Sequence, residues 1–146
     1  ASSLVGSEMC IRDSLKISSD GQINEIYNFG SQWVDCVAST ENYYACSSGK
    51  KAYLWVNDDS EPLIMDNAST VGGLSFDLDG NKLAVSSYGG VTVWQRGDRR
   101  WKSSRFVWKG SHGKVTFSPD GKYLVSAMQE NEVHGWRIRD KIDLDI

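Results

Sequence analysis

Residues 113–138 read GKVTFSPDGKYLVSAMQENEVHGWRI, and this stretch decides the fold. Apolar residues alternate up to Ser118, and the PDG sequence at 119–121 then supplies a tight turn, because proline presets φ and glycine accepts a positive φ. A second β-prone run leads to the polar turn at 129–131, and a third run carries Trp136. The pattern predicts three short antiparallel strands joined by hairpins.

A similar pattern occurs twice more upstream. Residues 72–95 read GGLSFDLDGNKLAVSSYGGVTVWQ, and residues 33–56 read WVDCVASTENYYACSSGKKAYLWV. Trp55, Trp94 and Trp136 lie near the ends of the three copies, with a near-constant period of about 40 residues. A repeat of this length with four strands in each unit is typical of the blades of a β-propeller.

These residues resemble WD40 repeats of the divergent bacterial kind, and the run 118–137 is similar to alphaproteobacterial WD40-repeat proteins. The resemblance covers about residues 15–146. It implies an all-β chain, a partial WD40 β-propeller with about three four-stranded antiparallel blades plus part of a preceding blade. We expect the preceding blade to end over 15–29, and further blades over 30–66, 67–108 and 109–146.

The expected strands follow from the same alternation of apolar and turn residues. They are 33–38, 43–47, 51–56 and 62–66 in the first full blade, 72–77, 82–87, 91–95 and 103–108 in the next, and 114–118, 123–127 and 133–138 in the last. The alternation of Ile142–Ile146 predicts an outer strand that the chain cuts short.

Residues 1–14 do not fit the repeat pattern. SLVGSEMCIRDS at 3–14 resembles a translated sequencing-adaptor junction, so we expect this stretch to be non-native. The alternative is a genuine N-terminal strand. Because propellers close with about 4–8 blades, we also expect an interior segment of a longer protein, whose end blades would self-associate through open faces.

Composition limits the function classes. The 146 residues carry a formal net charge of −3, which gives no general attraction to nucleic acid. No apolar run approaches the roughly 18–20 residues of a membrane-spanning helix, so no membrane association is expected, and we expect a cytoplasmic protein. Cys36 and Cys46 fall on neighbouring strands, and we expect two buried free thiols there.

The WD40 resemblance also implies a hydrogen-bonded set that stabilises a blade: a histidine, a serine or threonine, an aspartate and the tryptophan. His112, Ser126 and Trp136 match this set in the last blade, with Glu130 or Asn131 at the aspartate position. The other blades retain Ser86 with Trp94 and Ser47 with Trp55. A buried indole or imidazole N–H needs an acceptor, so we expect a structural role for these residues.

No pattern points to bond chemistry. His112 could instead be a metal ligand or a general base, but its only histidine companion is His134 and no spacing resembles a zinc site. There is no phosphate-binding glycine loop and no nucleophile motif. We therefore expect no catalytic residue, no metal and no cofactor.

Two surfaces are candidates for binding a partner. A basic cluster surrounds Trp101 and comprises Arg96, Arg99, Arg100, Lys102 and Arg105. It is interpreted as a solvated loop, a protein-binding surface or, least favoured, a nucleic-acid site. The second surface is the face of connecting loops, where we expect Gln32, Ser48, Lys50, Tyr88, Lys109, His112, Gln129, Glu130 and Asn131 to gather.

The function implied by the resemblance is a non-catalytic WD40 scaffold for protein–protein interaction, with an unidentified protein as partner. The predicted partner-binding residues are Lys50, Tyr88, Gln129, Glu130, Asn131, Arg99, Arg100, Trp101 and Lys102. One alternative is an enzyme or small-ligand-binding propeller with a site in its central channel. Another is nucleic-acid binding through the basic loop at 96–105.

Overall fold

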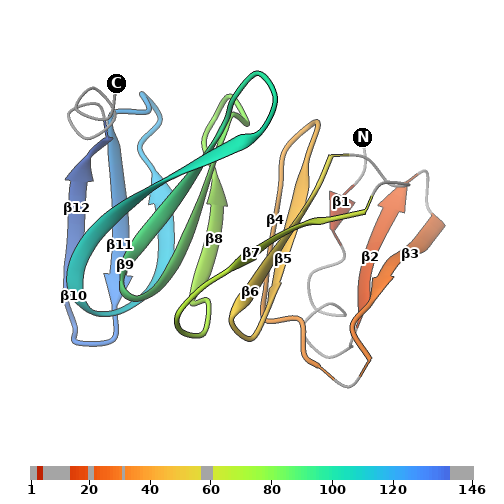
Figure 1. Cartoon of the computed structure of the whole chain (residues 1–146), viewed down its shortest axis with the longest axis horizontal. Coiled ribbons are helices and arrows are strands. Elements are labelled where there is room, and N and C mark those ends of the chain that lie inside the picture. The colour runs from red at the N-terminus through yellow and green to blue at the C-terminus, as the bar shows by residue number, and fades with distance from the viewer. Residues whose placement is uncertain (1–2, 5–13, 20–21, 31, 57–60, 139–146) are drawn as a thin grey trace. The chain divides into compact units, whose positions relative to one another are not determined.

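The computed structural model describes residues 3–4, 14–19, 22–30, 32–56 and 61–138, and the statements below concern these residues. All the elements that it describes are β-strands, paired antiparallel, so the all-β prediction is confirmed (Figure 1). The chain divides into two compact units, Ala1–Val71 and Gly72–Ile146, which we describe separately.

The first unit begins with a three-stranded sheet in the order β1-β2-β3. Its strands are β1 (Ser3–Leu4), β2 (Ser14–Ser19) and β3 (Gln22–Asn28). The hairpin expected over 15–29 is present, and its turn at 20–21 lies outside the described residues. Ser3 and Leu4 pair with β2, whereas residues 5–13 lie outside the described part, so the non-native origin of 1–14 stays a prediction.

A four-stranded sheet follows in the simple order β4-β5-β6-β7. Its strands are β4 (Cys36–Ser39), β5 (Tyr44–Ser48), β6 (Lys51–Trp55) and β7 (Leu63–Asp66). This arrangement confirms the four antiparallel strands predicted within 30–66. The turn after β4 has no glycine. Instead, the Thr40 hydroxyl accepts hydrogen bonds from the amides of Asn42 and Tyr43 at 3.2 and 3.1 Å.

Aromatic side chains form the core of this unit. Trp55 is 1 % exposed and stacks on Tyr44, with ring centroids 5.7 Å apart. Tyr27, from β3, contacts the same indole edge-on at 5.7 Å. Val34, Cys46 and Tyr53 complete the buried cluster. The three-stranded and four-stranded sheets of this unit therefore pack together through aromatic rings. The rings meet in stacked and edge-on arrangements, which are the favourable geometries for aromatic pairs.

The second unit contains a five-stranded sheet in the order β12-β11-β10-β9-β8. Its strands are β8 (Gly73–Phe76), β9 (Lys82–Arg96), β10 (Trp101–Phe117), β11 (Tyr123–Met128) and β12 (Val133–Arg137). The glycines of the two predicted Asp-Gly turns, Gly80 and Gly121, both have a φ of 74°. Their amides donate to Asp77 O and Ser118 O, which closes each turn as predicted.

The long element β9 does not run straight. The Arg96 amide donates to the Asn81 carbonyl at 2.9 Å, so the two ends of a 15-residue element lie side by side. Fifteen extended residues would span about 50 Å, so the chain must reverse within β9. The reversal falls at Gly89 and Gly90, which have φ of 90° and 151°. β9 thus contains both strands predicted at 82–87 and 91–95.

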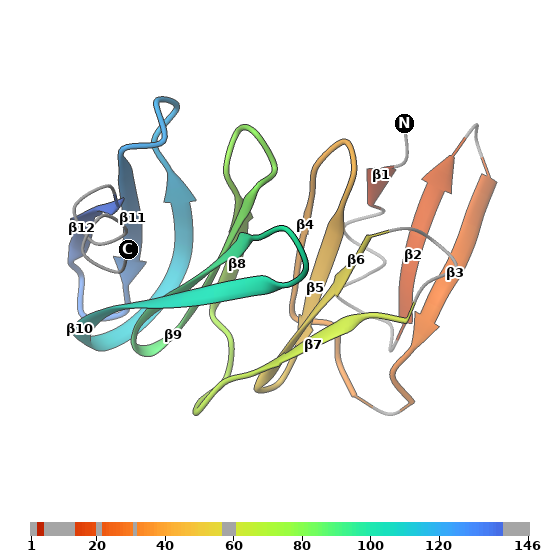
Figure 2. The ribbon, with the colours of Figure 1, turned by 45° about the horizontal axis from the view of Figure 1, so that its top comes forward.

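The long element β10 spans the predicted boundary between 67–108 and 109–146, which stays a prediction. Its first half, Trp101–Val107, pairs with β9, and its second half, from His112, pairs with β11. The outer strand expected at 103–108 and the first strand expected at 114–118 are therefore one continuous element (Figures 1 and 2). Gly110 lies between the halves with a φ of 118°, and β10 bends sharply there, with its pairing register toward both β9 and β11 shifted near Gly110 (Figure 1).

The core of the second unit is one cluster of apolar side chains from β9, β10, β11 and the residue that follows β12. Its buried residues are Ala84, Val91, Val93, Phe106, Val115, Phe117, Leu124 and Ile138, with Trp136 packed against them. β8 runs close to the second half of β10, because a Cβ at Gly72 or Gly73 would collide with the backbone of His112 and Gly113. The predicted outer strand at 142–146 lies outside the described residues.

Candidate interaction surfaces

His112 lies at the centre of a satisfied polar network. Its Nδ1 is 2.6 Å from Ser126 Oγ and its Nε2 is 2.7 Å from the Trp108 carbonyl oxygen. A carbonyl only accepts, so Nε2 carries the proton and Nδ1 accepts from the Ser126 hydroxyl. The imidazole is 3 % exposed. Both nitrogens are thus engaged within the protein, which fits the structural role expected of His112 and Ser126.

Trp136 contributes to this network by packing. Its ring lies 5.5 Å from the His112 ring and 4.6 Å, edge-on, from the His134 ring. His134 in turn stacks flat on Trp108, with centroids 4.3 Å apart and an interplanar angle of 8°. Burial and the nearby His112 lower the pKa of His134. The side chain of Glu130, one candidate for the aspartate position of the set, binds the Ser111 amide.

The two other serine–tryptophan pairs are not hydrogen-bonded in this way. Ser86 Oγ donates to the Gly113 carbonyl, which ties the strand after the 77–81 turn to β10. The Trp94 indole nitrogen is buried and has no acceptor among the described residues. The buried hydroxyl of Ser47 also lacks a partner within the described ranges. Packing, without an indole hydrogen bond to any described residue, must therefore hold Trp94 in place.

Four predicted partner-binding residues come together at one end of the five-stranded sheet. We call Tyr88, Gln129, Glu130 and Asn131 the Tyr88 surface. Tyr88 pairs with Ser111, whose carbonyl accepts the Gln129 amide at 3.0 Å. The Glu130 carboxylate accepts the Ser111 amide at 2.8 Å, and Asn131 adopts a left-handed φ of 63°. The three connections that form this end of the sheet are therefore joined to one another.

Arg105 belongs to this end of the sheet, and its prediction as a neighbour of Trp101 is wrong. Its guanidinium donates to Thr92 Oγ1 at 3.0 Å, to Ser87 Oγ at 3.3 Å and to the Tyr88 carbonyl at 3.2 Å. Arg105 pairs in register with Thr92, so its long side chain extends along the sheet toward Tyr88. Burial lowers the pKa of Arg105.

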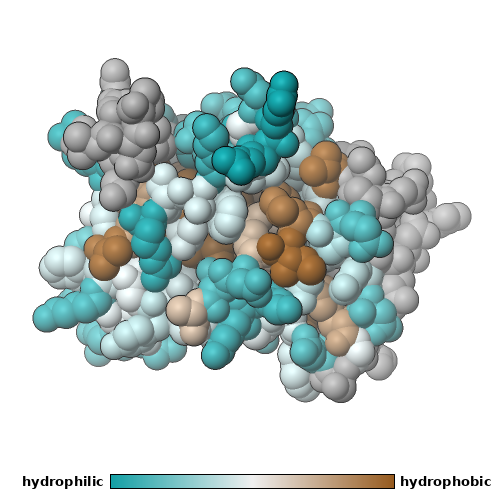
Figure 3. All heavy atoms as spheres, viewed as in Figure 1, coloured by the Kyte–Doolittle hydropathy of each residue, from teal (hydrophilic) through white to brown (hydrophobic). Residues whose placement is uncertain are grey.

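The remaining basic residues lie at the opposite end, where Arg96 pairs with Trp101. Asp98, Arg99, Arg100 and Lys102 line a shallow hollow of about 500 Å³ at the tip of this connection. Figure 3 shows the strongly hydrophilic surface over the tip. Trp101 is half-buried, and Asp98 offsets one of the positive charges. The predicted cluster is thus smaller and less basic than the sequence suggested.

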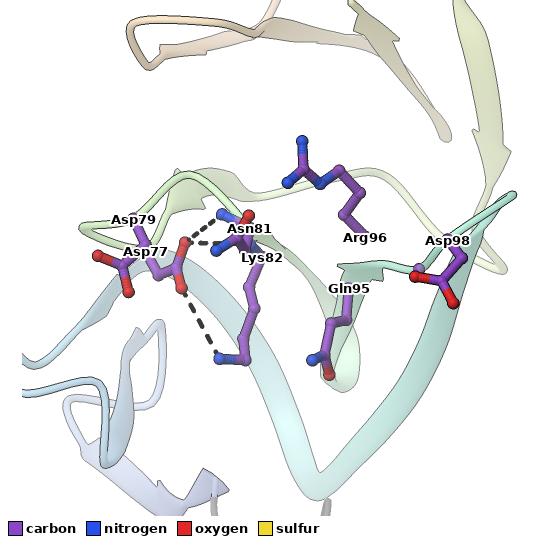
Figure 4. Close-up of a pocket in the computed structure, with 8 residues that line it drawn as sticks. Asp77, Asp79, Asn81, Lys82, Gln95, Arg96 and Asp98 are labelled. Carbon is purple, nitrogen blue, oxygen red and sulfur yellow. Dashed lines mark hydrogen bonds and ion pairs between the residues drawn. The ribbon is translucent and has the colours of Figure 1, made fainter.

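A polar cleft of about 550 Å³ adjoins the same end of β9 and was not predicted. It is lined by Asp77, Asp79, Asn81, Lys82, Gln95, Arg96, Gly97 and Asp98 (Figure 4). The buried Asp77 carboxylate accepts the amides of Asn81 and Lys82 at 2.8 and 3.0 Å, and Lys82 Nζ lies 3.7 Å away. Asp77 therefore stabilises the hairpin turn, and it is not available to bind a ligand in the cleft.

The first unit has a hollow of its own at the turn between β5 and β6. We call it the Trp33 hollow. It measures about 410 Å³ and is lined by Gln32, Trp33, Asp35, Ser48, Gly49, Lys50 and Lys51. The expected gathering of Gln32, Ser48 and Lys50 is confirmed, and Ser48 Oγ donates to Gln32 Oε1 at 3.3 Å. Trp33 was predicted to begin a strand, but β4 begins at Cys36 and Trp33 is 61 % exposed.

Within the described ranges, no group of three or more histidine, cysteine, aspartate or glutamate side chains could hold a metal ion. Cys36 and Cys46 lie on adjacent strands with no disulfide between them; Cys46 is buried as predicted, whereas Cys36 is only half-buried. Burial strongly raises the pKa of Cys46. No helix in the described part of the chain has the length and apolar character needed to cross a membrane.

Two comparisons with known proteins were made. A scan of this sequence against models of protein families found no match, and a search of curated proteins found none either.

Proposed function

We propose that this chain is a segment of a WD40-type β-propeller that acts as a non-catalytic scaffold for a protein partner in a bacterial cytoplasm. The repeated strand pattern supports this architecture. Trp55 lies opposite Tyr44 on the preceding strand, and Trp136 lies opposite Leu124 in the same way. A tryptophan at the same register position of two antiparallel hairpins is what repeated blades would produce.

The Tyr88 surface is the observation that carries the proposed binding role. Tyr88 is 64 % exposed, and Gln129, Glu130 and Asn131 are exposed beside it. Their backbones are held by bonds from Ser111 and Arg105, so little conformational entropy is lost when a partner binds. Tyrosine is enriched at the energetic centres of protein interfaces. A rigid framework that presents an exposed tyrosine among amide side chains suits protein recognition better than catalysis.

Affinity capture with matched tyrosine variants tests this proposal. The whole chain would be expressed as bait with Tyr88→Ala or with Tyr123→Ala, since Tyr123 is also exposed but lies at the other end of β11. We expect the Tyr88→Ala variant to lose a partner that the Tyr123→Ala variant retains. A photo-crosslinking residue at position 129 should form an adduct with the same partner. Equal capture by both variants would contradict the proposal.

The nucleic-acid alternative loses support from the position of Arg105. Binding of single-stranded nucleic acid requires cationic side chains interleaved with an accessible aromatic ring. In this chain Arg105 turns toward Tyr88, and Trp101 is half-buried at the base of the connection. We therefore favour a protein partner.

A further inference from the structure

The walls of the Trp33 hollow are fixed by hydrogen bonds within the first unit. Asp35 Oδ2 accepts the Gly49 amide at 2.9 Å, and the Asp35 amide donates to the Ser47 carbonyl at 2.8 Å. On the other side of the turn, the Asn67 amide and side chain both donate to the Lys50 carbonyl, at 2.9 and 3.1 Å. The turn that carries the two lysines is therefore held in place before any ligand binds.

Trp33 is unusual for a tryptophan. With 61 % of its surface exposed, it makes no ring contact and no hydrogen bond with any described residue. Trp55, in the same unit, is 1 % exposed and contacts three tyrosine rings. An exposed indole offers a large rigid apolar face and a free N–H donor, which are the properties that make tryptophan the leading residue in binding hot spots.

The charge beside Trp33 is positive on balance, because Lys50 and Lys51 outnumber the exposed Asp35 carboxylate in the lining. Lys50 and Lys51 are exposed, and neither ammonium group has an ion-pair partner in the described part of the chain. The nearby carboxylate of Asp35 is engaged by the Gly49 amide. The hollow therefore combines an apolar platform with two lysines and one carboxylate, and a ligand that is apolar at its centre and acidic at its edges complements its net positive charge.

We propose that the Trp33 hollow binds an acidic, extended segment of a protein partner. An apolar side chain of the segment stacks on the Trp33 indole, and flanking carboxylates pair with Lys50 and Lys51. The inference deepens the proposed scaffold function and rests on it, because it names the chemistry of a protein partner. Phosphorylated and sugar ligands fit less well, since two flexible lysines lack the fixed multidentate donors that phosphates and sugars require.

Fluorine NMR of the whole chain tests this site directly. The six tryptophans would be labelled as 5-fluorotryptophan, and Trp33 would be assigned by its absence in Trp33→Phe. The probes are three capped pentapeptides with the sequence Gly-Glu-Leu-Glu-Gly, Gly-Gln-Leu-Gln-Gly or Gly-Lys-Leu-Lys-Gly. We expect the glutamate peptide alone to shift the Trp33 resonance, with an affinity that falls as salt is raised.

Variants separate the two parts of the site. Trp33→Ala should weaken binding of the glutamate peptide by about tenfold or more, as expected for a hot-spot aromatic residue. Lys50→Gln should weaken it by about two- to fivefold, as expected for an exposed ion pair. Lys122→Gln removes an exposed lysine in the other unit and should leave the affinity unchanged.

Three outcomes would overturn the inference: no shift with the glutamate peptide, an equal shift with the glutamine peptide, or binding that Lys50→Gln with Lys51→Gln leaves intact. Each outcome leaves the scaffold function open, because the capture experiment depends on Tyr88. Conversely, a Trp33 shift that depends on Lys50 would support the acidic-ligand site even if Tyr88→Ala had no effect on capture.

Discussion

Trp55 and Trp136 lie at matching register positions, but different forces hold them. Around Trp136, His112 bonds Ser126 and the Trp108 carbonyl, so both imidazole nitrogens are satisfied. Around Trp55 there is no histidine, and the indole is enclosed by Tyr27, Tyr44 and Tyr53. One site is held by a polar network, and the other is held by aromatic stacking.

The difference shows what the histidine contributes. Both sheets carry a buried serine on the strand that precedes the tryptophan, but at different registers: Ser126 pairs two residues before Trp136, and Ser47 pairs three residues before Trp55. Ser126 has His112 as its partner, whereas the Ser47 hydroxyl is buried with no partner among the described residues. A buried hydroxyl without a partner destabilises the fold. A buried serine is therefore stabilising where a histidine accepts its hydrogen bond and destabilising where no described residue is within reach as a partner.

The largest predicted difference concerns the two tryptophans. Trp55→Ala should lower the free energy of unfolding by about 3–5 kcal/mol, toward the upper end, because the indole is completely enclosed. Trp136→Ala should fall at the lower end of that range, because its ring is only half-buried. Guanidinium denaturation followed by circular dichroism gives both values. A larger effect at Trp136 would mean that the polar network dominates the aromatic cluster.

A smaller but sharper test compares two serine-to-alanine variants. Ser126→Ala should lower the free energy of unfolding by about 1–2 kcal/mol, because His112 Nδ1 loses its donor. Ser47→Ala should be neutral or should raise it by up to about 1 kcal/mol, because an unpaired hydroxyl is removed. Urea denaturation of both variants measures the effects. Equal losses of stability in the two variants would show that the Ser47 hydroxyl has a hydrogen-bond partner.

A double-mutant cycle checks the origin of the Ser126 effect. If the loss comes from the His112–Ser126 bond, Ser126→Ala should cost little in a His112→Leu background. Additive losses would place the effect elsewhere in the core.

The smallest predicted effect is on pH dependence. The pKa of His134 is lowered from 6.5, first by burial against Trp108 and Trp136 and then by His112, while Glu132 opposes the shift. The unfolded chain therefore binds the proton more tightly, so stability should fall as pH drops through 6.5 and down to the folded-state pKa. His134 is only half-buried, so solvent screening keeps the effect small.

The check combines two measurements. Proton NMR of the His134 ring should give a midpoint below the value in a short reference peptide. The unfolding free energy of His134→Phe should vary less with pH in this window than that of the unchanged chain. A midpoint above 6.5 would contradict the prediction.

Local patterns predicted the strands well, because alternation and turn residues act over a few neighbours. The Asp-Gly turns and the β5–β6 hairpin follow from residues adjacent in sequence. The gathering of Tyr88, Gln129 and Glu130 at one end of the sheet was predicted from the repeat pattern. The exposure of Trp33 could not be predicted from the sequence. A tryptophan next to an apolar run favours a strand whether its side chain is exposed or buried.

Arg105 was misplaced for a related reason. Sequence proximity grouped it with Arg99 and Arg100, but strand register and the length of its side chain decide where its guanidinium lies. The unpaired Trp94 nitrogen was also beyond sequence reasoning, since the Ser86 hydroxyl binds the Gly113 carbonyl and does not accept from the indole. The polar cleft beside Asp77 arises from two turns that are distant in sequence.

Because β10 bonds strands on both of its sides, it should couple the local unfolding of the two parts of this unit. The 17-residue element β10 bonds β9 along its first half and β11 along its second, and it bends at Gly110 between them. The two halves of the sheet should therefore behave as a single cooperative unit in native-state hydrogen exchange. Amides of Val93 and Val125, on either side of β10, should become exposed in the same opening event. A new chain end introduced beside Gly110 would divide that event in two.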